Sequence, residues 1–226
     1  MSVLEKITMI ALPEDQYFPE ETNKTQIYLH HTAGSSNPYN VIEYWARNEE
    51  RVATSFVIGG RPIVKNAPWE DGKIVQCFST KYWGYHLGLK SVNMPVGSKP
   101  PMDLQKHSIG IEVCNYGPLT KQADGTFRNY LKGKMAPNEV MDLGYVYRGY
   151  QYWHSYTDAQ IASLKELLQF LCTKWSIPSK YNGPDMWEIT PRAFVGEPGI
   201  WSHTSARKDK TDMYPHPKLI EMLKAL

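Results

Sequence analysis

The sequence has little net charge, no long apolar run and no leader-like start, and each absence removes a class of protein. The formal net charge is +2 over 226 residues, so we expect no nucleic-acid partner, which needs a strong basic excess on one face. No apolar stretch approaches the roughly 18 residues of a membrane-spanning helix, so we expect no membrane insertion. Residues 1–13 carry charges early and no apolar core segment, so we predict no signal peptide and synthesis in the cytoplasm.

Cysteine is also scarce. The chain has only Cys77, Cys114 and Cys172, and no C-x-x-C pair. An odd count at wide spacing argues against a disulfide framework and against a thiolate zinc site. Each cysteine lies in an apolar run, so we expect three small buried hydrophobic residues.

Motifs of several hydrolase classes are missing too. The absence of a G-x-S-x-G nucleophile elbow argues against a serine hydrolase of that type. A glycosidase needs two carboxylates across a cleft. Glu112, a lone carboxylate in an apolar run, could be one of them, but the sequence identifies no second. A cysteine hydrolase built on Cys114 has no assigned base.

What remains is an ordinary globular composition, with 42% hydrophobic and 21% charged residues, and a length that suits one well-buried core. Strands that alternate with helices favour a single α/β domain. We interpret residues 1–25 as a lead-in, 26–226 as the main domain, and about 116–153 as an inserted long hairpin with a flap-like loop. The aromatic run at 145–153 is either a wall for substrate or packing on the core.

The pattern of apolar residues and turn signals predicts the main elements. Strands are expected at 27–31, 53–58, 63–64, 74–78, 108–114 and 199–203. A helix is expected from Pro38, with Asn37 as its N-cap, to near Asn48. A second helix follows the capping box that starts at Thr157 and runs to Trp175, and a last one starts at Pro217.

The segment 27–34, IYLHHTAG, is the centre of the chemical argument. It is a strand that ends in two histidines, and because neighbours on a strand point to opposite faces, only one of His30 and His31 can face a site. A second predicted strand also ends in histidine, His203, and Asp212 follows nine residues later. Two imidazoles and one carboxylate form a common catalytic zinc shell that leaves a fourth position to water. A histidine at a strand end is more often a hydrogen-bonded structural residue, so the spacing alone leaves both interpretations open.

Three motifs together resemble those of the zinc-dependent N-acetylmuramoyl-L-alanine amidases, which include phage lysozyme-amidases, AmpD-type enzymes and peptidoglycan recognition proteins. They are IYLHHTAG at 27–34, SIGIE at 108–112, and SH at 202–203 followed by KTD at 210–212. The resemblance implies a peptidoglycan-recognition-protein-like fold, an α/β domain with a central mixed β-sheet flanked by helices and, here, a hairpin insertion.

The same resemblance implies roles for six residues. The zinc ligands would be His30, His203 and Asp212, while His31 would face the other way. Glu112 matches the carboxylate that activates the attacking water, and Lys210 matches the lysine that steadies the oxyanion. His86 resembles a histidine at the cleft edge, which we assign to substrate binding.

The chain departs from the family pattern in one place near the site. Many phage members carry a tyrosine just before the phenylalanine of the second strand, whereas here Thr54 and Ser55 precede Phe56. An aspartate as third ligand, together with Glu112, favours the AmpD-like variant of the site.

The resemblance implies hydrolysis of the amide bond between N-acetylmuramic acid and L-alanine, with peptidoglycan or a muropeptide as partner and zinc as cofactor. We expect a monomer that acts on the bacterial cell wall after release by a phage lysis system, as an endolysin. Two alternatives stay open: a peptidoglycan-binding module without activity, and a cytosolic amidase that recycles muropeptides.

Overall fold

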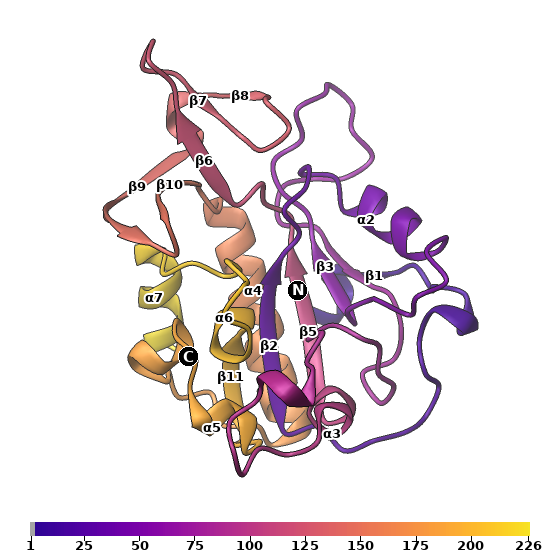
Figure 1. Cartoon of the computed structure of the whole chain (residues 1–226). Helices are drawn as coiled ribbons and strands as arrows, with labels where there is room; N and C mark the ends of the chain where they lie inside the picture. Colours follow the sequence, from indigo (N-terminus) through magenta and orange to yellow (C-terminus); the bar gives the residue numbers. More distant parts are fainter. Residues whose placement is uncertain (1–2) are drawn as a thin grey trace.

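Buried β-branched and aromatic residues build the central strands of the computed structural model, which describes residues 3–226. Six strands form a mixed sheet in the order β1-β4-β3-β5-β2-β11. Their bounds are β1 (Ile7–Met9), β2 (Gln26–His31), β3 (Phe56–Ile58), β4 (Ile74–Gln76), β5 (Ser108–Val113) and β11 (Gly199–Ser202). The strands β3, β5, β2 and β11 run parallel to one another, and β4 is antiparallel to β3. Helices lie on both sides of this sheet (Figure 1).

The helices differ greatly in length. The longer ones are α2 (Pro38–Trp45), α4 (Asp158–Trp175) and α7 (Pro217–Lys224). The shorter ones are α1 (Val3–Lys6), α3 (Pro101–Lys106), α5 (Pro191–Phe194) and α6 (His203–Ala206). Within residues 3–226 no helix has the length and apolarity that a bilayer span requires.

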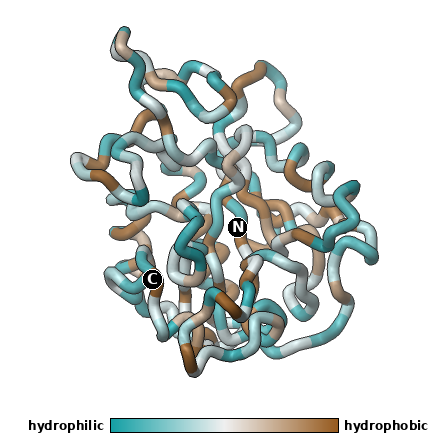
Figure 2. The backbone as a smooth tube through the Cα atoms, in the orientation of Figure 1, coloured by the Kyte–Doolittle hydropathy of each residue, from teal (hydrophilic) through white to brown (hydrophobic). Residues whose placement is uncertain are grey.

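Side chains alternate along the strands, so the central sheet has two faces, each packed against a different hydrophobic cluster. Ile27 and Leu29 of β2 face the main hydrophobic core, where α4 and α7 cover the sheet. Tyr28 lies in a different cluster with residues of α3, α5 and α6, and His30 is on the same side because strand side chains alternate. Figure 2 shows mostly hydrophobic residues along the central strands and mostly hydrophilic residues in the outer loops. The site-bearing face therefore lies opposite the long helix α4.

Both predicted helix caps are confirmed. The Asn37 side chain accepts a hydrogen bond from the Tyr39 backbone N–H at 2.9 Å, and α2 ends at Trp45, about three residues before the predicted end. Thr157 and Gln160 form the reciprocal capping box of α4. Such caps satisfy backbone N–H groups that have no partner inside the helix.

The segment from Tyr116 to His154 is more elaborate than the long hairpin predicted for it. It contains β6 (Pro118–Lys121), β7 (Phe127–Arg128), β8 (Lys134–Met135), β9 (Val140–Tyr147) and β10 (Tyr150–His154). These strands form a separate five-stranded antiparallel sheet, β8-β7-β6-β10-β9, which we call the second sheet. Figure 1 shows β6, β7 and β8 projecting away from the central sheet.

The aromatic run of the second sheet divides between core and surface. Tyr147 and Trp153 are buried in the main core, whereas Tyr145 and Tyr150 are exposed. Core packing therefore accounts for Tyr147 and Trp153, Tyr145 and Tyr150 are available at the surface, and Tyr152 is partly buried.

Two sequence-based expectations about strands need correction. Residues 63–64 form no strand, and Ile63 is 74% exposed, because a two-residue apolar run has no neighbouring strand to pair with. The lead-in, in contrast, supplies β1, which pairs in parallel with β4 at the edge of the central sheet.

Candidate metal centre

The carboxyl ends of three neighbouring strands bring the predicted site residues to one place. His30, the second-last residue of β2, is in register with Glu112 of β5, so both side chains lie on the same face of the sheet. On the other side of β2, Ser202 pairs with Leu29, and His203 follows as the first residue of α6. Topology thus explains why residues more than 170 positions apart meet.

His30, His203 and Asp212 form the group that could hold a metal ion. Nδ1 of His30 lies 3.0 Å from Nδ1 of His203, and Oδ2 of Asp212 lies 3.2 Å from the first nitrogen and 2.9 Å from the second. Zinc–ligand bonds of about 2.0–2.1 Å in tetrahedral geometry separate ligand atoms by about 3.3 Å. The three atoms therefore form nearly the face of such a tetrahedron, and the donor set fits zinc.

Burial sets the ionisation state of these ligands. Burial lowers the pKa of His30 to about 4, and the neighbouring His203 acts in the same direction. For Asp212, burial acts to raise the pKa, but the neighbouring His203 and His30 outweigh it and hold the pKa well below its usual range. A neutral imidazole and an ionised carboxylate are the forms that bind a metal ion.

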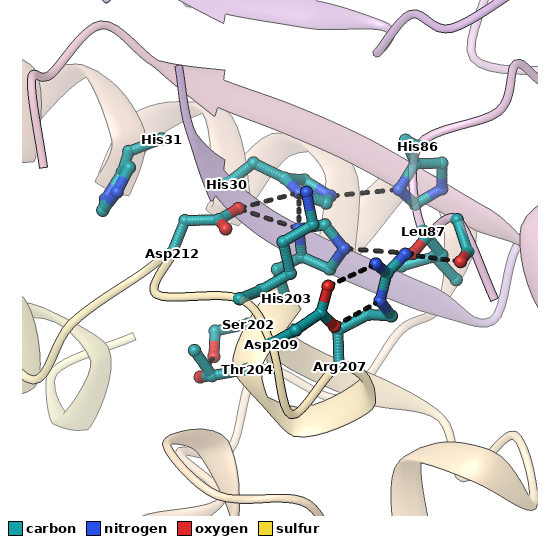
Figure 3. A network of polar contacts seen from close by, with 12 residues as sticks. His30, His31, His86, Leu87, Ser202, His203, Thr204, Arg207, Asp209 and Asp212 are labelled. Carbon is teal, nitrogen blue, oxygen red and sulfur yellow. Dashed lines mark hydrogen bonds and ion pairs between the residues drawn. The ribbon is translucent and has the colours of Figure 1, made fainter. Parts of the chain in front are cut away.

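A chain of hydrogen bonds fixes which nitrogen of His30 is free. Ser108 Oγ donates to the Leu104 carbonyl oxygen at 2.7 Å, so it accepts from Nε2–H of His86 at 2.8 Å. Nδ1 of His86 is then an acceptor, and it receives Nε2–H of His30 at 3.1 Å. Since a neutral imidazole carries one N–H, Nδ1 of His30 is left unprotonated and directed at the other two ligand atoms (Figure 3).

A backbone carbonyl fixes which ring nitrogen of His203 carries the proton. Its Nε2 lies 3.0 Å from the carbonyl oxygen of Leu87, which can only accept, so Nε2 carries the proton and Nδ1 is free. The Gln105 side chain holds this segment in place by accepting from the backbone N–H groups of His86 and Leu87. Such partners of the outer ring nitrogen orient ligating histidines and raise their basicity.

Glycine at position 110 makes room for His86. A Cβ atom there would lie 3.1 Å from Cγ of His86 and 2.7 Å from Cγ2 of Thr54. The bare backbone of β5 at this point lets the imidazole of His86 lie over the strand beside His30.

Glu112 and Lys210 line the same cavity of about 300 Å³ as the three ligands and His86. Burial raises the pKa of Glu112 well above its usual range, and the charge of Asp212 adds to this effect while Lys210 opposes it. Within residues 3–226, Oε2 of Glu112 is buried with no hydrogen-bond partner. The structure therefore brings all six predicted site residues together around one cavity.

His31 points away from the ligand set, as the alternation of strand side chains requires (Figure 3). Its Nδ1 lies 2.9 Å from the hydroxyl of Tyr156, and its ring contacts Trp153 and Tyr214. His31 packs between the central sheet and the aromatic residues beside it.

Sequence reasoning missed the groups that orient the ligands. Ser108 opens the SIGIE motif, so its position carried a signal, but no role was assigned to it. The Leu87 carbonyl could not be found from sequence, because every residue has a carbonyl and only the tertiary fold selects this one.

Comparisons with known proteins bear on the family and the fold of the chain. The family model described as N-acetylmuramoyl-L-alanine amidase matches residues 21–217. Among solved structures, the chain resembles PlyL (12% identity, covering 96% of this chain and 95% of that one, TM-score 0.50) and a mutant endolysin from Bacillus subtilis (14%, 97% and 96%, 0.51). It also resembles AmpDh3 from Pseudomonas aeruginosa (18%, 92% and 61%, 0.50). At these identities the likeness shows the fold alone, and a search of curated protein sequences finds no match.

Proposed function

Because the chain belongs to the N-acetylmuramoyl-L-alanine amidase family, we propose that it hydrolyses the amide bond between N-acetylmuramic acid and L-alanine in peptidoglycan, with zinc at the site described above. One observation carries this proposal: His30, His203 and Asp212 converge as ligands in a cavity that Glu112 and Lys210 also line. A binding module needs no such set of acid, base and ligand groups.

The proposed metal ligands are Nδ1 of His30, Nδ1 of His203 and Oδ2 of Asp212. Zinc bound there would supply Lewis acidity, the chemistry that polarises a carbonyl group and makes water more acidic. The hydrogen bonds of His30 and His203 to His86 and Leu87 keep the rings turned so that both Nδ1 lone pairs face each other and Oδ2 of Asp212.

Glu112 is the proposed general base and acid. Its pKa is raised by burial, so the carboxyl can take a proton from the attacking water and return it to the leaving amine. The partnerless Oε2 leaves one oxygen free for that proton.

Lys210 is the proposed electrostatic partner of the reaction. It lies two residues before Asp212 and lines the same cavity. Its ammonium group stabilises the negative charge that develops on the carbonyl oxygen, a contribution that is large where water is excluded.

His86 also lines the cavity, but both ring nitrogens already contact His30 and Ser108. Direct contact of His86 with substrate stays a prediction. Its contacts support a role in orienting His30.

For the biological setting we propose a phage-type lytic enzyme that degrades the bacterial cell wall as a monomer. The structural likeness to an endolysin supports the fold of such an enzyme. The TM-score with AmpDh3 is nearly the same, so the fold alone does not separate the two settings. A lytic enzyme should turn over intact sacculi faster than soluble muropeptides, whereas a recycling enzyme should show the reverse preference.

The activity is tested on purified peptidoglycan with zinc supplied. We expect new L-alanine amino termini, and EDTA should stop their release. Glu112→Gln should bind zinc and lose activity by about 10²–10⁴-fold, the usual contribution of a positioned proton-transfer group. Glu221→Gln, an exposed acid on α7, serves as the matched control and should retain activity. Binding of the polymer without new amino termini would show a binding module instead.

A further inference from the structure

The turn between β9 and β10 of the second sheet lies against the loop that joins the last two metal ligands. Residues 204–211, which we call the ligand loop, comprise the rest of the short helix α6 and the turn after it, lie between His203 and Asp212, and include Lys210. The backbone N–H of Thr204 donates to the carbonyl oxygen of Asp212 at 3.0 Å, which closes the loop at its base.

One side chain of the second sheet binds this loop at four points. Nη1 of Arg148 donates to the carbonyl oxygen of Lys208 at 2.6 Å and lies 3.3 and 3.4 Å from those of Arg207 and Lys210. Nη2 donates to the carbonyl oxygen of Thr204 at 3.1 Å. Carbonyl groups outside helices and sheets need donors when they are not solvated, and the planar guanidinium supplies several in fixed directions.

The Arg148 side chain is only 11% exposed, and Glu188 lies 3.6 Å from Nη2. The guanidinium is thus held among loop carbonyls and one carboxylate rather than in open solvent. This surrounding leaves little freedom for the loop to move without breaking contacts.

The backbone of the turn gives a second, independent indication. Arg148 has φ of +50° and Gly149 has φ of +86°. A two-residue hairpin turn with two positive φ values favours Asn, Asp or Gly at its first position, and a long cationic residue there carries a conformational cost. Turn geometry therefore does not account for arginine at position 148, whereas its contacts to the ligand loop do.

We propose that Arg148 is a positioning residue through which the second sheet holds the ligand loop, so that Lys210 and Asp212 face the cavity. The inference rests on the proposed function, because it gives the second sheet a role in the proposed zinc site. Arg148 touches none of the three ligand atoms, and it reaches the cavity-lining residue Lys210 only at its backbone carbonyl, so it acts through the loop backbone.

The test is Arg148→Asn, since asparagine suits the turn but cannot reach the loop. We expect a thermal midpoint equal to or above that of the wild type. Zinc affinity, measured by competition with a chelator, should fall about 10-fold, and kcat on peptidoglycan should fall about 10–100-fold with little change in KM. In the zinc-free protein, the amides of residues 205–211 should exchange faster while those of β2 and β5 keep their protection. Arg148→Lys keeps the positive charge but lacks the planar guanidinium with its several donors, so zinc affinity, kcat and loop exchange should be intermediate.

Arg128→Asn is the matched control, because Arg128 is on β7 of the same sheet and donates to the exposed carbonyl of Lys132. It should leave zinc affinity, kcat and loop exchange unchanged. Wild-type values of all three in Arg148→Asn would overturn the inference, and so would faster exchange throughout the central sheet with a lower thermal midpoint. A wild-type protein that neither binds zinc nor cleaves peptidoglycan would contradict the proposed function instead, and the exchange measurement would still decide whether Arg148 holds the loop.

Discussion

At the scale of single residues, the chemistry of the site depends on the groups that accept hydrogen bonds from the outer ring nitrogens of the histidines. Ser108 and the Leu87 carbonyl accept from imidazole N–H groups, directly or through His86, and thereby leave both Nδ1 atoms bare. Three bare electron-pair donors within about 3 Å of one another repel unless a cation lies among them. This arrangement favours metal binding over an ordinary hydrogen-bonded cluster.

This assignment predicts the behaviour of variants at position 86. His86→Ala should lower zinc affinity by about 10–100-fold, because His30 loses the acceptor that orients it. His86→Asn should retain most of the affinity, since its amide oxygen can take the place of Nδ1. Chelator competition measures both, with His107→Ala as a control, because His107 contacts the Asn23 carbonyl outside this chain of bonds. Wild-type affinity in His86→Ala would show that the contact does not orient His30.

At the scale of elements, the capping box of α4 connects a local sequence signal to the packing of the central sheet. The Thr157 hydroxyl accepts from the Gln160 backbone N–H and donates to Asp71 at 2.7 Å. The Gln160 side chain then reaches the carbonyl oxygen of Cys114, just beyond β5. The start of the helix is therefore fixed to the end of the strand that carries Glu112.

Thr157→Ala should destabilise the fold by about 1 kcal/mol, the usual loss for an N-cap side chain, while leaving zinc affinity unchanged. For a chain of this size that corresponds to a fall of about 2–4 °C in thermal midpoint. Thr173→Ala in the last turns of the same helix is the comparison. Its hydroxyl bonds back to Gln169, and alanine has the higher helix propensity, so its midpoint should not fall. Equal losses in both variants would contradict a specific role for the cap.

Element prediction from sequence succeeded where a signal was local. Asn37 and Thr157 predicted the starts of their helices as N-cap residues, and apolar β-branched runs predicted β2 and β5. The second sheet was underestimated, since β7 and β8 are two residues each and carry no periodicity long enough to recognise. Arg148 could not be assigned either, because its partners lie 56–62 residues away in sequence; arginine before glycine between two aromatic residues was the one available hint.

At the scale of the whole molecule, folding assembles a site whose parts are far apart in the chain. Motif order and spacing predicted that His30, His203 and Asp212 lie together as candidate ligands, and the register of β2 with β5 and β11 explains their meeting. Because the ligands come from distant segments, an ion bound there ties these segments together in the folded state only.

Zinc should therefore raise the stability of the whole fold. At a free concentration 100 times its Kd, one bound ion stabilises by about 2.7 kcal/mol, or about 5–10 °C in thermal midpoint for this chain length. Differential scanning calorimetry with and without zinc measures the shift, and excess EDTA should reverse it. His203→Ala lacks a ligand and should show a much smaller shift; an undiminished shift would place the ion elsewhere.

The three cysteines described at the outset have a consequence for where such a fold can work. Cys77, Cys114 and Cys172 are buried and unpaired, and burial raises the pKa of each thiol, to about 11 for Cys172. Oxidants attack the exposed thiolate form, which these side chains do not present. The fold should therefore neither form nor lose a disulfide when conditions change from reducing to oxidising, because its three thiols are out of reach and unpaired.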